Sequence, residues 1–300
     1  MNPTSHIPVM TSQAIEFLHV KPGGRYLDGT LGGGGHTAEI LRRSSPDGKV
    51  LSLDVDPQAI ARFKRSLDSR RSLGMTSARW KGAEINFRDL GKIAQREKMT
   101  PLDGILLDLG FSSDQMADPT NGLSFNVEGP LDMRLWRSTE LTAADIVNAW
   151  RERELADLIR TYGEERFAHR IARAIVTARK RAKIVTTTQL ADIVAAAVPS
   201  NYERGRIHPA TRTFQALRIT VNDELNALRD AISGAHDVLA PRGRLVIISF
   251  HSLEDRIVKR AFKEKAQWNT LTKKPLVPTE HDMKENPRAR SAKLRAAETI

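Results

Sequence analysis

The stretch YLDGTLGGGGHTAEI, residues 26–40, decides the fold, because it joins an apolar run to a helix through four consecutive glycines. The apolar run predicts a strand over Arg25–Asp28, and the residues after the glycines predict a helix over Thr37–Arg43. Glycines between a strand and a helix let backbone N–H groups come close to a ligand, and the helix N-terminus favours negative charge. A tight glycine turn without a ligand is the alternative interpretation.

The spacing of the glycines separates two kinds of ligand loop. A phosphate-binding P-loop would need glycine in place of Thr30 and lysine in place of His36, so that interpretation fails. Gly33 and Gly35, with Ala38 three residues later, instead fit the G-x-G-x-x-[GA] pattern of dinucleotide-binding loops. The pattern therefore favours a Rossmann-like sheet.

Three aspartates near the ends of apolar runs support a cofactor crevice. They are Asp28, Asp54 and Asp108. Asp54 follows the loop by about 20 residues, where a carboxylate accepts hydrogen bonds from ribose hydroxyls. NAD and S-adenosylmethionine both carry that ribose. The cationic sulfonium of S-adenosylmethionine suits an acidic rim better than the pyrophosphate of NAD, which favours S-adenosylmethionine without excluding NAD.

Strand-like and helix-like segments alternate through the first third of the chain, which predicts parallel βαβ units and an α/β fold. Further strands are expected at Val50–Asp54, near Ser77–Gly82 and at Asp103–Leu109. The last of these is continuously apolar, as in strands that are buried on both faces.

The pattern changes in the middle of the chain. From about Asp114 to Arg212 we find no convincing strand, and helices are expected at Ala143–Ala149, Arg151–Tyr162, Glu164–Arg181 and Thr188–Ala197. A turn at Ala240–Gly243 and a strand at Arg244–Phe250 follow, then a helix at Leu253–Lys265 and two strands in the tail, the last near Ser291–Ala296. We expect a discontinuous Rossmann-like domain, residues 1–113 and 213–300, interrupted by a helical domain, residues 114–212.

The composition excludes several kinds of site. Cysteine is absent, which rules out disulfides and thiolate nucleophiles, and none of the eight histidines forms an H-x-x-x-H pair, so no metal site is expected. No apolar run approaches the roughly 18 residues of a membrane span. The first ten residues lack the apolar core of a signal peptide. We therefore expect a cytoplasmic protein with no membrane partner.

The chain carries a net charge of +11, which favours a polyanionic partner. The basic residues gather in three acid-free runs. The first holds Arg166, Arg170, Arg173, Arg179, Lys180, Arg181 and Lys183, the second Arg204, Arg206, His208, Arg212 and Arg218, and the third Arg288, Arg290, Lys293 and Arg295. A solvated face normally mixes both signs, so runs of one sign predict phosphate contacts.

Several longer stretches together resemble one known family. They are DGTLGGGGHT (28–37), LDVDPQAI (53–60), DGILLDLGFSSDQ (103–115), GPLDMR (129–134), YGEERFAHRIARAIV (162–176), HPATRTFQALRI (208–219), PRGRLVIISFHSLEDRIVK (241–259) and NPRARSAKLR (286–295). From about His6 to Arg295 the chain resembles the MraW/RsmH family, the 16S ribosomal RNA (cytosine-N4)-methyltransferases.

The resemblance implies a class I (Rossmann-like) methyltransferase sheet with an inserted all-helical domain for RNA recognition. It also implies S-adenosyl-L-methionine as the cofactor and N4-methylation of a cytidine in the decoding region of 16S ribosomal RNA, with that RNA or the small ribosomal subunit as the partner. By the same likeness the cofactor would be bound by Gly34, Gly35, His36, Asp54, Phe87, Asp108 and Gln115.

The catalytic residue stays open. Asp108 is a candidate, because it follows the fourth expected strand, and Ser249, His251 and Ser252 would lie on the same rim. Many enzymes that methylate exocyclic amines carry [DNS]-P-P-[YFW] at this place, whereas residues 108–111 read DLGF here. Two other functions also stay open, an NAD-dependent oxidoreductase and a non-catalytic RNA-binding factor of ribosome assembly. The number of chains that associate is not predicted.

Overall fold

The computed structural model describes residues 8–69, 75–111, 115–116, 118–136 and 139–300. The chain divides into two compact units. The sheet unit comprises Met1–Ser112 and Leu225–Ile300, and the helical unit comprises Ser113–Glu224. Each unit is described by itself below.

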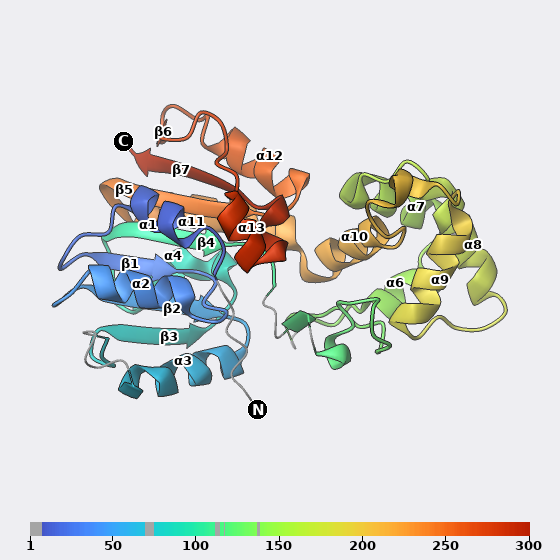
Figure 1. Cartoon of the computed structure of the whole chain (residues 1–300), viewed down its shortest axis with the longest axis horizontal. Coiled ribbons are helices and arrows are strands. Elements are labelled where there is room, and N and C mark those ends of the chain that lie inside the picture. Colours follow the sequence, from blue (N-terminus) through green and yellow to red (C-terminus); the bar gives the residue numbers. More distant parts are fainter. Residues whose placement is uncertain (1–7, 70–74, 112–114, 117, 137–138) are drawn as a thin grey trace. The chain divides into compact units, whose positions relative to one another are not determined.

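The sheet unit is built on one seven-stranded sheet with the order β3-β2-β1-β4-β5-β7-β6 (Figure 1). Its strands are β1 (Arg25–Asp28), β2 (Lys49–Asp54), β3 (Trp80–Glu84), β4 (Leu102–Asp108), β5 (Leu239–Ser249), β6 (Trp268–Thr270) and β7 (Lys293–Thr299). Strands β1 to β5 pair in parallel, and β7 is antiparallel between β5 and β6. The strand order reverses between β1 and β4, and ligands of open α/β sheets bind outside the carboxyl ends of the strands at such a point. The predicted α/β class and Rossmann-like sheet are confirmed.

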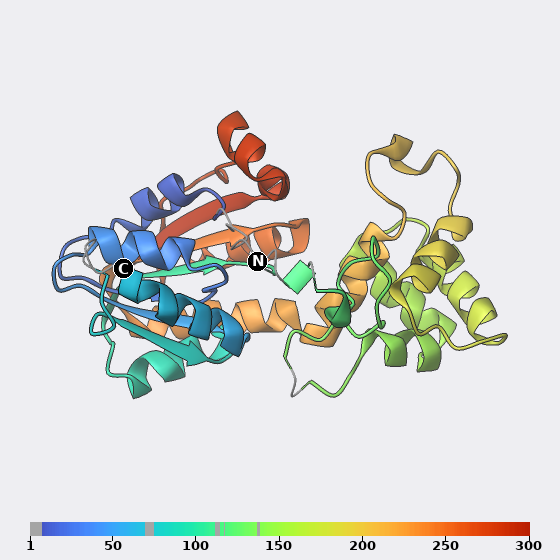
Figure 2. The ribbon, with the colours of Figure 1, turned by 60° about the horizontal axis from the view of Figure 1, so that its bottom comes forward.

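Helices cover both faces of this sheet (Figure 2). One face packs against α1 (Thr11–Leu18), α2 (Gly35–Arg43) and α3 (Pro57–Ser69), and the other against α4 (Leu90–Arg96), α11 (Glu224–Val238) and α12 (Ser252–Ala261). Successive side chains of β4 alternate between the two layers: Leu106 joins the first, and Ile105 and Leu107 join the second. This burial on both faces explains why the strand is continuously apolar.

The helical unit contains five α-helices in its described residues, α6 (Ala143–Ala149), α7 (Glu152–Gly163), α8 (Ala168–Arg179), α9 (Thr187–Ala197) and α10 (Thr211–Asn222). Helix α7 packs on α8 and α10, and α8 packs on α9. Gly163 permits the close approach of α7 to α10, because a Cβ there would lie 2.6 Å from the carbonyl oxygen of Arg212. Among the residues that the structure describes, no helix is both long enough and apolar enough to cross a membrane.

Several boundaries differ from the sequence predictions, and three of them have a clear physical reason. The helical unit ends at Glu224 and not at residue 212, because α10 packs on α7 and belongs with it. The predicted turn at Ala240–Gly243 lies inside β5, where Arg242 has a φ of 61° and the pairing with β4 shifts register. Helix α8 begins at Ala168, later than predicted, because Glu164 adopts a left-handed conformation with a φ of 50° after α7.

Candidate functional site

The glycine loop after β1 is tied to the carboxyl ends of the neighbouring strands. The N–H of Gly29 donates to the carbonyl of Leu106 on β4, and the N–H of Leu31 donates to that of Leu53 on β2, both at 2.9 Å. Gly34 has a φ of 78°, and a Cβ at this position would lie 2.1 Å from the ring of Phe63. Only glycine therefore fits here, and the loop lies across the edge of the sheet where its strand order reverses.

Asp54, at the end of β2, fixes this loop. Its Oδ2 accepts a hydrogen bond from the N–H of Gly32 at 2.7 Å, and its Oδ1 accepts one from the N–H of Asp56 at 2.8 Å. Burial raises the pKa of Asp54 to about 6, and the two backbone donors oppose that rise. Each carboxylate oxygen can accept a second hydrogen bond, so the predicted contact with a ribose hydroxyl stays compatible with this geometry.

Asp28, at the end of β1, has a different place from the one that the sequence suggested. Its side chain is fully buried, and its oxygens accept hydrogen bonds from the N–H of Thr30 at 3.1 Å and the hydroxyl of Thr37 at 2.6 Å. Burial raises its pKa. Asp28 therefore supports the loop from within the fold and does not form part of an open acidic rim.

A series of buried hydrogen bonds continues from Asp28, and the sequence did not predict it. The hydroxyls of Thr37 and Ser52 lie 2.8 Å apart, and Nε1 of Trp80 donates to Ser52 at 3.0 Å. Because an indole only donates and Thr37 donates to Asp28, Ser52 must donate to Thr37. The series links β3, β2, α2 and β1 beneath the loop. The polar Ser52 within the apolar run Val50–Leu53 was the signal that could have indicated it.

His36 and Asp108 meet at the carboxyl edge of the sheet. Nε2 of His36 lies 3.4 Å from Oδ2 of Asp108, and the N–H of Asp108 donates to the hydroxyl of Thr30 at 2.7 Å. Burial by itself would lower the pKa of His36. The neighbouring Asp108 carboxylate and the charge of Asp28 outweigh burial, and the net effect raises the pKa.

Buried polar atoms of this pair have no hydrogen-bond partner in the described part of the chain. They are Nδ1 of His36 and Oδ1 of Asp108, whereas Nε2 of His36 faces Oδ2 of Asp108 at 3.4 Å. Buried polar groups are nearly always satisfied in native proteins, so unsatisfied ones need an explanation such as a ligand that completes them. A donor and acceptor set at the reversal point of a Rossmann-like sheet is suited to a polar cofactor.

The other two side chains that the resemblance implied have different settings. Phe87 is half-buried at the start of the short 3-10 helix Phe87–Asp89 and packs against the core, and a Cβ on Gly29 would lie 3.4 Å from its Cβ. It therefore borders the loop. Gln115 belongs to the helical unit, where its carbonyl accepts from the side chain of Asn121 at 3.2 Å. Its part in cofactor binding stays a prediction.

The three candidates after β5 have local structural partners. His251 caps α12 by accepting the N–H of Glu254 at 3.3 Å, and Glu254 accepts the N–H of Phe250 at 2.8 Å. Ser252 begins this helix, and the buried Ser249 donates to the carbonyl of Lys293 at 3.3 Å. Helix capping thus accounts for His251 and Glu254.

The basic runs differ in how far their charges are already paired. In the third run, Arg295 is buried and pairs with Asp255 at 2.6 Å, and Lys293 lies 3.7 Å from the same carboxylate, so these two are not free for phosphates. The side chain of Arg288 lies outside the described residues. In the second run, Arg212 pairs with Glu203 at 3.0 Å and Arg218 with Glu224 at 2.7 Å. The exposed members of this run are Arg204, Arg206 and His208.

The first run remains mostly exposed along and after α8. Its exposed members are Arg166, Arg170, Arg173, Lys180, Arg181 and Lys183. Arg166 lies over the ring of Phe167 at 4.8 Å, and Arg179 donates to the carbonyl of Val147 at 2.7 Å. Ile171 and Ile175 are buried, as the predicted apolar stripe required. Of the three runs, the first is the one that keeps most of its charge at the surface.

Comparisons with known proteins agree with this geometry. The profile of the MraW methylase family matches residues 3–300. A protein of Thermomicrobium roseum is 49% identical, over 99% of this chain and 94% of its own length, and one of Geobacter sulfurreducens is 46% identical, over 99% of each chain. Both are named ribosomal RNA small subunit methyltransferase H.

A solved rRNA methylase of Streptococcus thermophilus superposes with a TM-score of 0.45 at 11% identity, covering 98% of each chain. That likeness is too distant to add to the assignment, which rests on the family profile and the two relatives. The strand order, the glycine loop and these matches agree on a class I methyltransferase sheet with an all-helical insertion. The chain belongs to the MraW methylase family.

Proposed function

We propose that the protein uses S-adenosyl-L-methionine to methylate N4 of a cytidine in the decoding region of 16S ribosomal RNA. The observation that carries the cofactor part is the set of unsatisfied polar atoms on His36 and Asp108, at the same edge of the sheet as the acidic end of β2. Support for the RNA comes from the family and from relatives named for the ribosomal small subunit. The base, the atom and the region come from the family resemblance.

The loop geometry favours S-adenosylmethionine over NAD. In NAD enzymes the glycine loop offers its N–H groups to a pyrophosphate. Here the carboxylate of Asp54 already accepts the N–H of Gly32. A second carboxylate, Asp108, keeps an oxygen unpartnered within the described residues. Two carboxylates at this edge repel a pyrophosphate and attract a sulfonium with its ammonium tail. The geometry therefore disfavours the NAD-dependent alternative.

We assign the cofactor contacts as follows. Asp54 would accept from ribose hydroxyls, and Gly34 and Gly35 would let the ligand approach the backbone. His36 and Asp108 would complete their hydrogen bonds on the ligand, and Phe87 would border it. Gln115 is a further proposed contact, which comes from the family resemblance alone. When bound, the cofactor supplies an electrophilic methyl group.

The chemistry of the acceptor fits a site without cysteine. The lone pair of a cytosine amine is delocalised into the ring, so the enzyme must hold N4 in line with the methyl group at about 3–3.5 Å. Methylation gives N4 one new bond to carbon, and the nitrogen loses one proton. The unpartnered Oδ1 of Asp108 is an acceptor suited to an N–H of that amine. Methylation at C5 requires a thiolate, which this chain does not have.

The partner in this proposal is 16S ribosomal RNA, naked or in the small subunit, and the reaction would take place in the cytoplasm. A non-catalytic assembly factor is the second candidate, since the exposed arginines of α8 would serve it equally. The intact glycine loop and the unsatisfied polar set argue against it, because a protein that binds only RNA has no use for them.

Titration calorimetry of the purified chain tests the cofactor part. The proposal expects binding of S-adenosylmethionine and S-adenosylhomocysteine and none of NAD. Binding of NAD alone would support the oxidoreductase, and binding of neither would support the assembly factor.

Labelled methyl transfer tests the product. The chain is incubated with methyl-labelled S-adenosylmethionine and unmethylated small subunits or naked 16S RNA, and nuclease digests are examined by mass spectrometry. The expected product is N4-methylcytidine at one position in the decoding region. Label on an adenine, on cytosine C5 or only on transfer RNA would contradict the substrate assignment and leave the cofactor assignment standing.

A further inference from the structure

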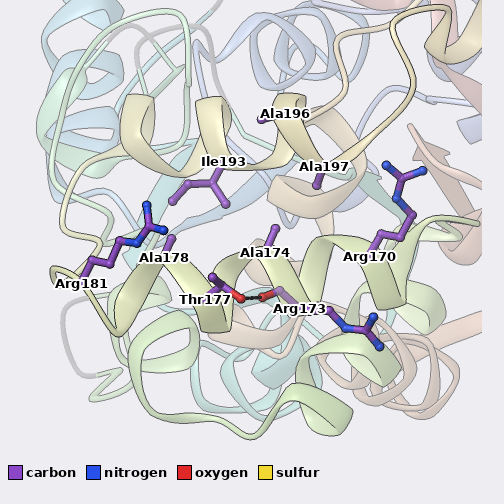
Figure 3. Close-up of a pocket in the computed structure, with 9 residues that line it drawn as sticks. All are labelled: Arg170, Arg173, Ala174, Thr177, Ala178, Arg181, Ile193, Ala196 and Ala197. Atoms are coloured by element: carbon purple, nitrogen blue, oxygen red, sulfur yellow. Dashed lines mark hydrogen bonds between the residues drawn. The ribbon is translucent and has the colours of Figure 1, made fainter.

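A groove of about 500 Å³ lies between α8 and α9 of the helical unit (Figure 3). Its lining residues are Arg170, Arg173, Ala174, Thr177, Ala178, Arg181, Ile193, Ala196 and Ala197. The alanines of the two facing helices leave the space open, because no long side chain fills it. Figure 3 shows Ala174, Ala178, Ala197 and Ile193 between the two helices and Ala196 at the outer edge of α9, with Arg170 at one end and Arg181 at the other.

The charge at this groove has one sign. Helix α8 contains no acid, and the one acid of α9, Asp192, does not line the groove. Arg170 and Arg181 have no ion-pair partner among the residues that the structure describes, and Arg170 has the ring of Phe167 at 5.9 Å. Arg173 differs, since it points away from α9 and pairs with Glu152 on α7 at 3.4 Å. The two end arginines are thus the charges available to a ligand.

The apolar surface between the end arginines, formed by the alanines and called the alanine floor below, selects among anionic ligands. A bare phosphate or a duplex would touch the arginines but leave the alanine floor uncovered, because bases in an A-form helix are stacked inside it. An acidic peptide would bring backbone N–H and C=O groups that need partners. Among the lining residues the only hydroxyl, that of Thr177, already donates to the carbonyl of Arg173 at 2.8 Å. The flat apolar face of an unstacked base has no such need.

We propose that the groove between α8 and α9 binds an unstacked segment of single-stranded RNA, with phosphates on Arg170 and Arg181 and a base or ribose on the alanine floor. The proposal rests on the RNA substrate of the proposed function and names the part of the insertion that holds it. Arg170 lies near the start of α8 and Arg181 lies two residues beyond its end, so most of the helix separates the two arginines, with about 14 Å of helix between Arg170 and Arg179. The RNA strand therefore runs along α8.

The first test measures the salt dependence of RNA binding to the full chain, with a short fluorescent single-stranded RNA followed by anisotropy. For single strands each lost phosphate contact reduces the slope of log affinity against log salt by about 0.7. The double variant Arg170→Gln/Arg181→Gln is expected to have a slope shallower by about 1.4. The matched control Arg153→Gln/Arg160→Gln removes two charges from α7. The side chains of Arg153 and Arg160 are 93% and 60% exposed, and this variant should keep the wild-type slope.

The second test fills the floor without changing charge. Ala196→Phe places a ring in the groove from an exposed position of α9, and should weaken single-strand binding severalfold with an unchanged salt slope. Ala149→Phe, at an exposed position of α6, is its control. The wild type should bind the single strand more tightly than a duplex that contains it. The proposal would be contradicted if Arg170→Gln/Arg181→Gln kept the wild-type salt slope or if Ala196→Phe had no effect on binding. It would also be contradicted if the wild type bound the duplex as tightly as the single strand, or if a polyglutamate peptide competed with the RNA.

The two proposals fail in different ways. In one outcome the groove variants lose RNA binding, but the wild type forms no N4-methylcytidine. This outcome would support RNA binding in the groove and contradict the proposed function. Normal product from the wild type, with groove variants that bind RNA as the wild type does, would overturn the groove alone. S-adenosylmethionine affinity, measured by calorimetry, should be the same in the groove variants as in the wild type.

Discussion

One acid of the helical unit and one of the sheet unit differ in how far their side-chain oxygens are satisfied. In the helical unit Glu165 is 1% exposed, and its oxygens accept from the hydroxyl of Tyr202 and the N–H of Phe167, with Arg212 at 3.8 Å. At the sheet edge Asp108 and His36 keep atoms without partners among the described residues. A satisfied buried acid holds a fold together, whereas an unsatisfied one marks a place for a ligand.

The outer surfaces extend this comparison. The sheet unit offers carboxylates at the carboxyl ends of β2 and β4, which suit a small cationic ligand. The helical unit offers end arginines around an apolar groove, which suit a polyanion. The two units would then bind the two reactants of one methyl transfer.

The largest expected effect is on cofactor binding when Asp54 is replaced. Asp54→Ala removes a charge and the partner of the Gly32 N–H, and should weaken S-adenosylmethionine binding by about 1.5–3 kcal/mol, roughly 10- to 150-fold. Calorimetry measures the change. The control Asp103→Ala removes a carboxylate that accepts the N–H of Arg25 at the other end of β4, and should leave the affinity unchanged. Unchanged affinity in a folded Asp54→Ala chain would remove Asp54 from the site.

The next effect is a pH dependence of the same affinity. The pKa of Asp54 is raised to about 6 in the free chain, and a cationic ligand needs its ionised form. Affinity should therefore approach its full value about one pH unit above 6 and fall as the pH drops through 6, by about tenfold between pH 7 and pH 5. Asp54→Asn should bind more weakly and lose this dependence. A slope that survives unchanged in Asp54→Asn would assign the titration to another group at the site, such as His36.

The smallest effect concerns the satisfied acid of the helical unit. Burial, together with the bond to Glu165, raises the pKa of Tyr202, which therefore stays a protonated donor. Tyr202→Phe removes that donor and should lower the free energy of unfolding by about 1 kcal/mol, with unchanged cofactor affinity. Chemical denaturation and calorimetry measure the two quantities. A Tyr202→Phe chain of unchanged stability but impaired cofactor binding would reverse the distinction between the two units.

Much of the sheet unit could be predicted because its signals are local. Four glycines between an apolar run and a helix fix the loop at Gly32–Gly35, and the continuously apolar β4 indicates a strand covered on both faces. The place of Asp28 could not be read in this way. Whether a strand-end carboxylate lines an edge or turns inward depends on partners from other elements, here Thr37 on α2.

The charge runs show a second limit of the sequence. Arg170 and Arg295 look alike within acid-free runs, yet Asp255 comes 40 residues before Arg295 and pairs with it in the folded chain. Likewise, no local pattern brings Arg181 and Ala196 to the same groove. Tertiary contacts decide which charges remain available, so the runs indicated a polyanionic partner but not which arginines face it.

The most direct test of the division between the units is the steady-state rate of methyl transfer to unmethylated small subunits, with each reactant varied in turn. Asp54→Asn should raise the KM for S-adenosylmethionine about tenfold and leave the KM for the RNA substrate within about twofold of wild type. Arg170→Gln/Arg181→Gln should do the reverse. The account predicts one cation site in the sheet unit and one polyanion site in the helical unit. It would be contradicted if either variant raised both KM values together, or if Asp54→Asn changed only the KM for RNA.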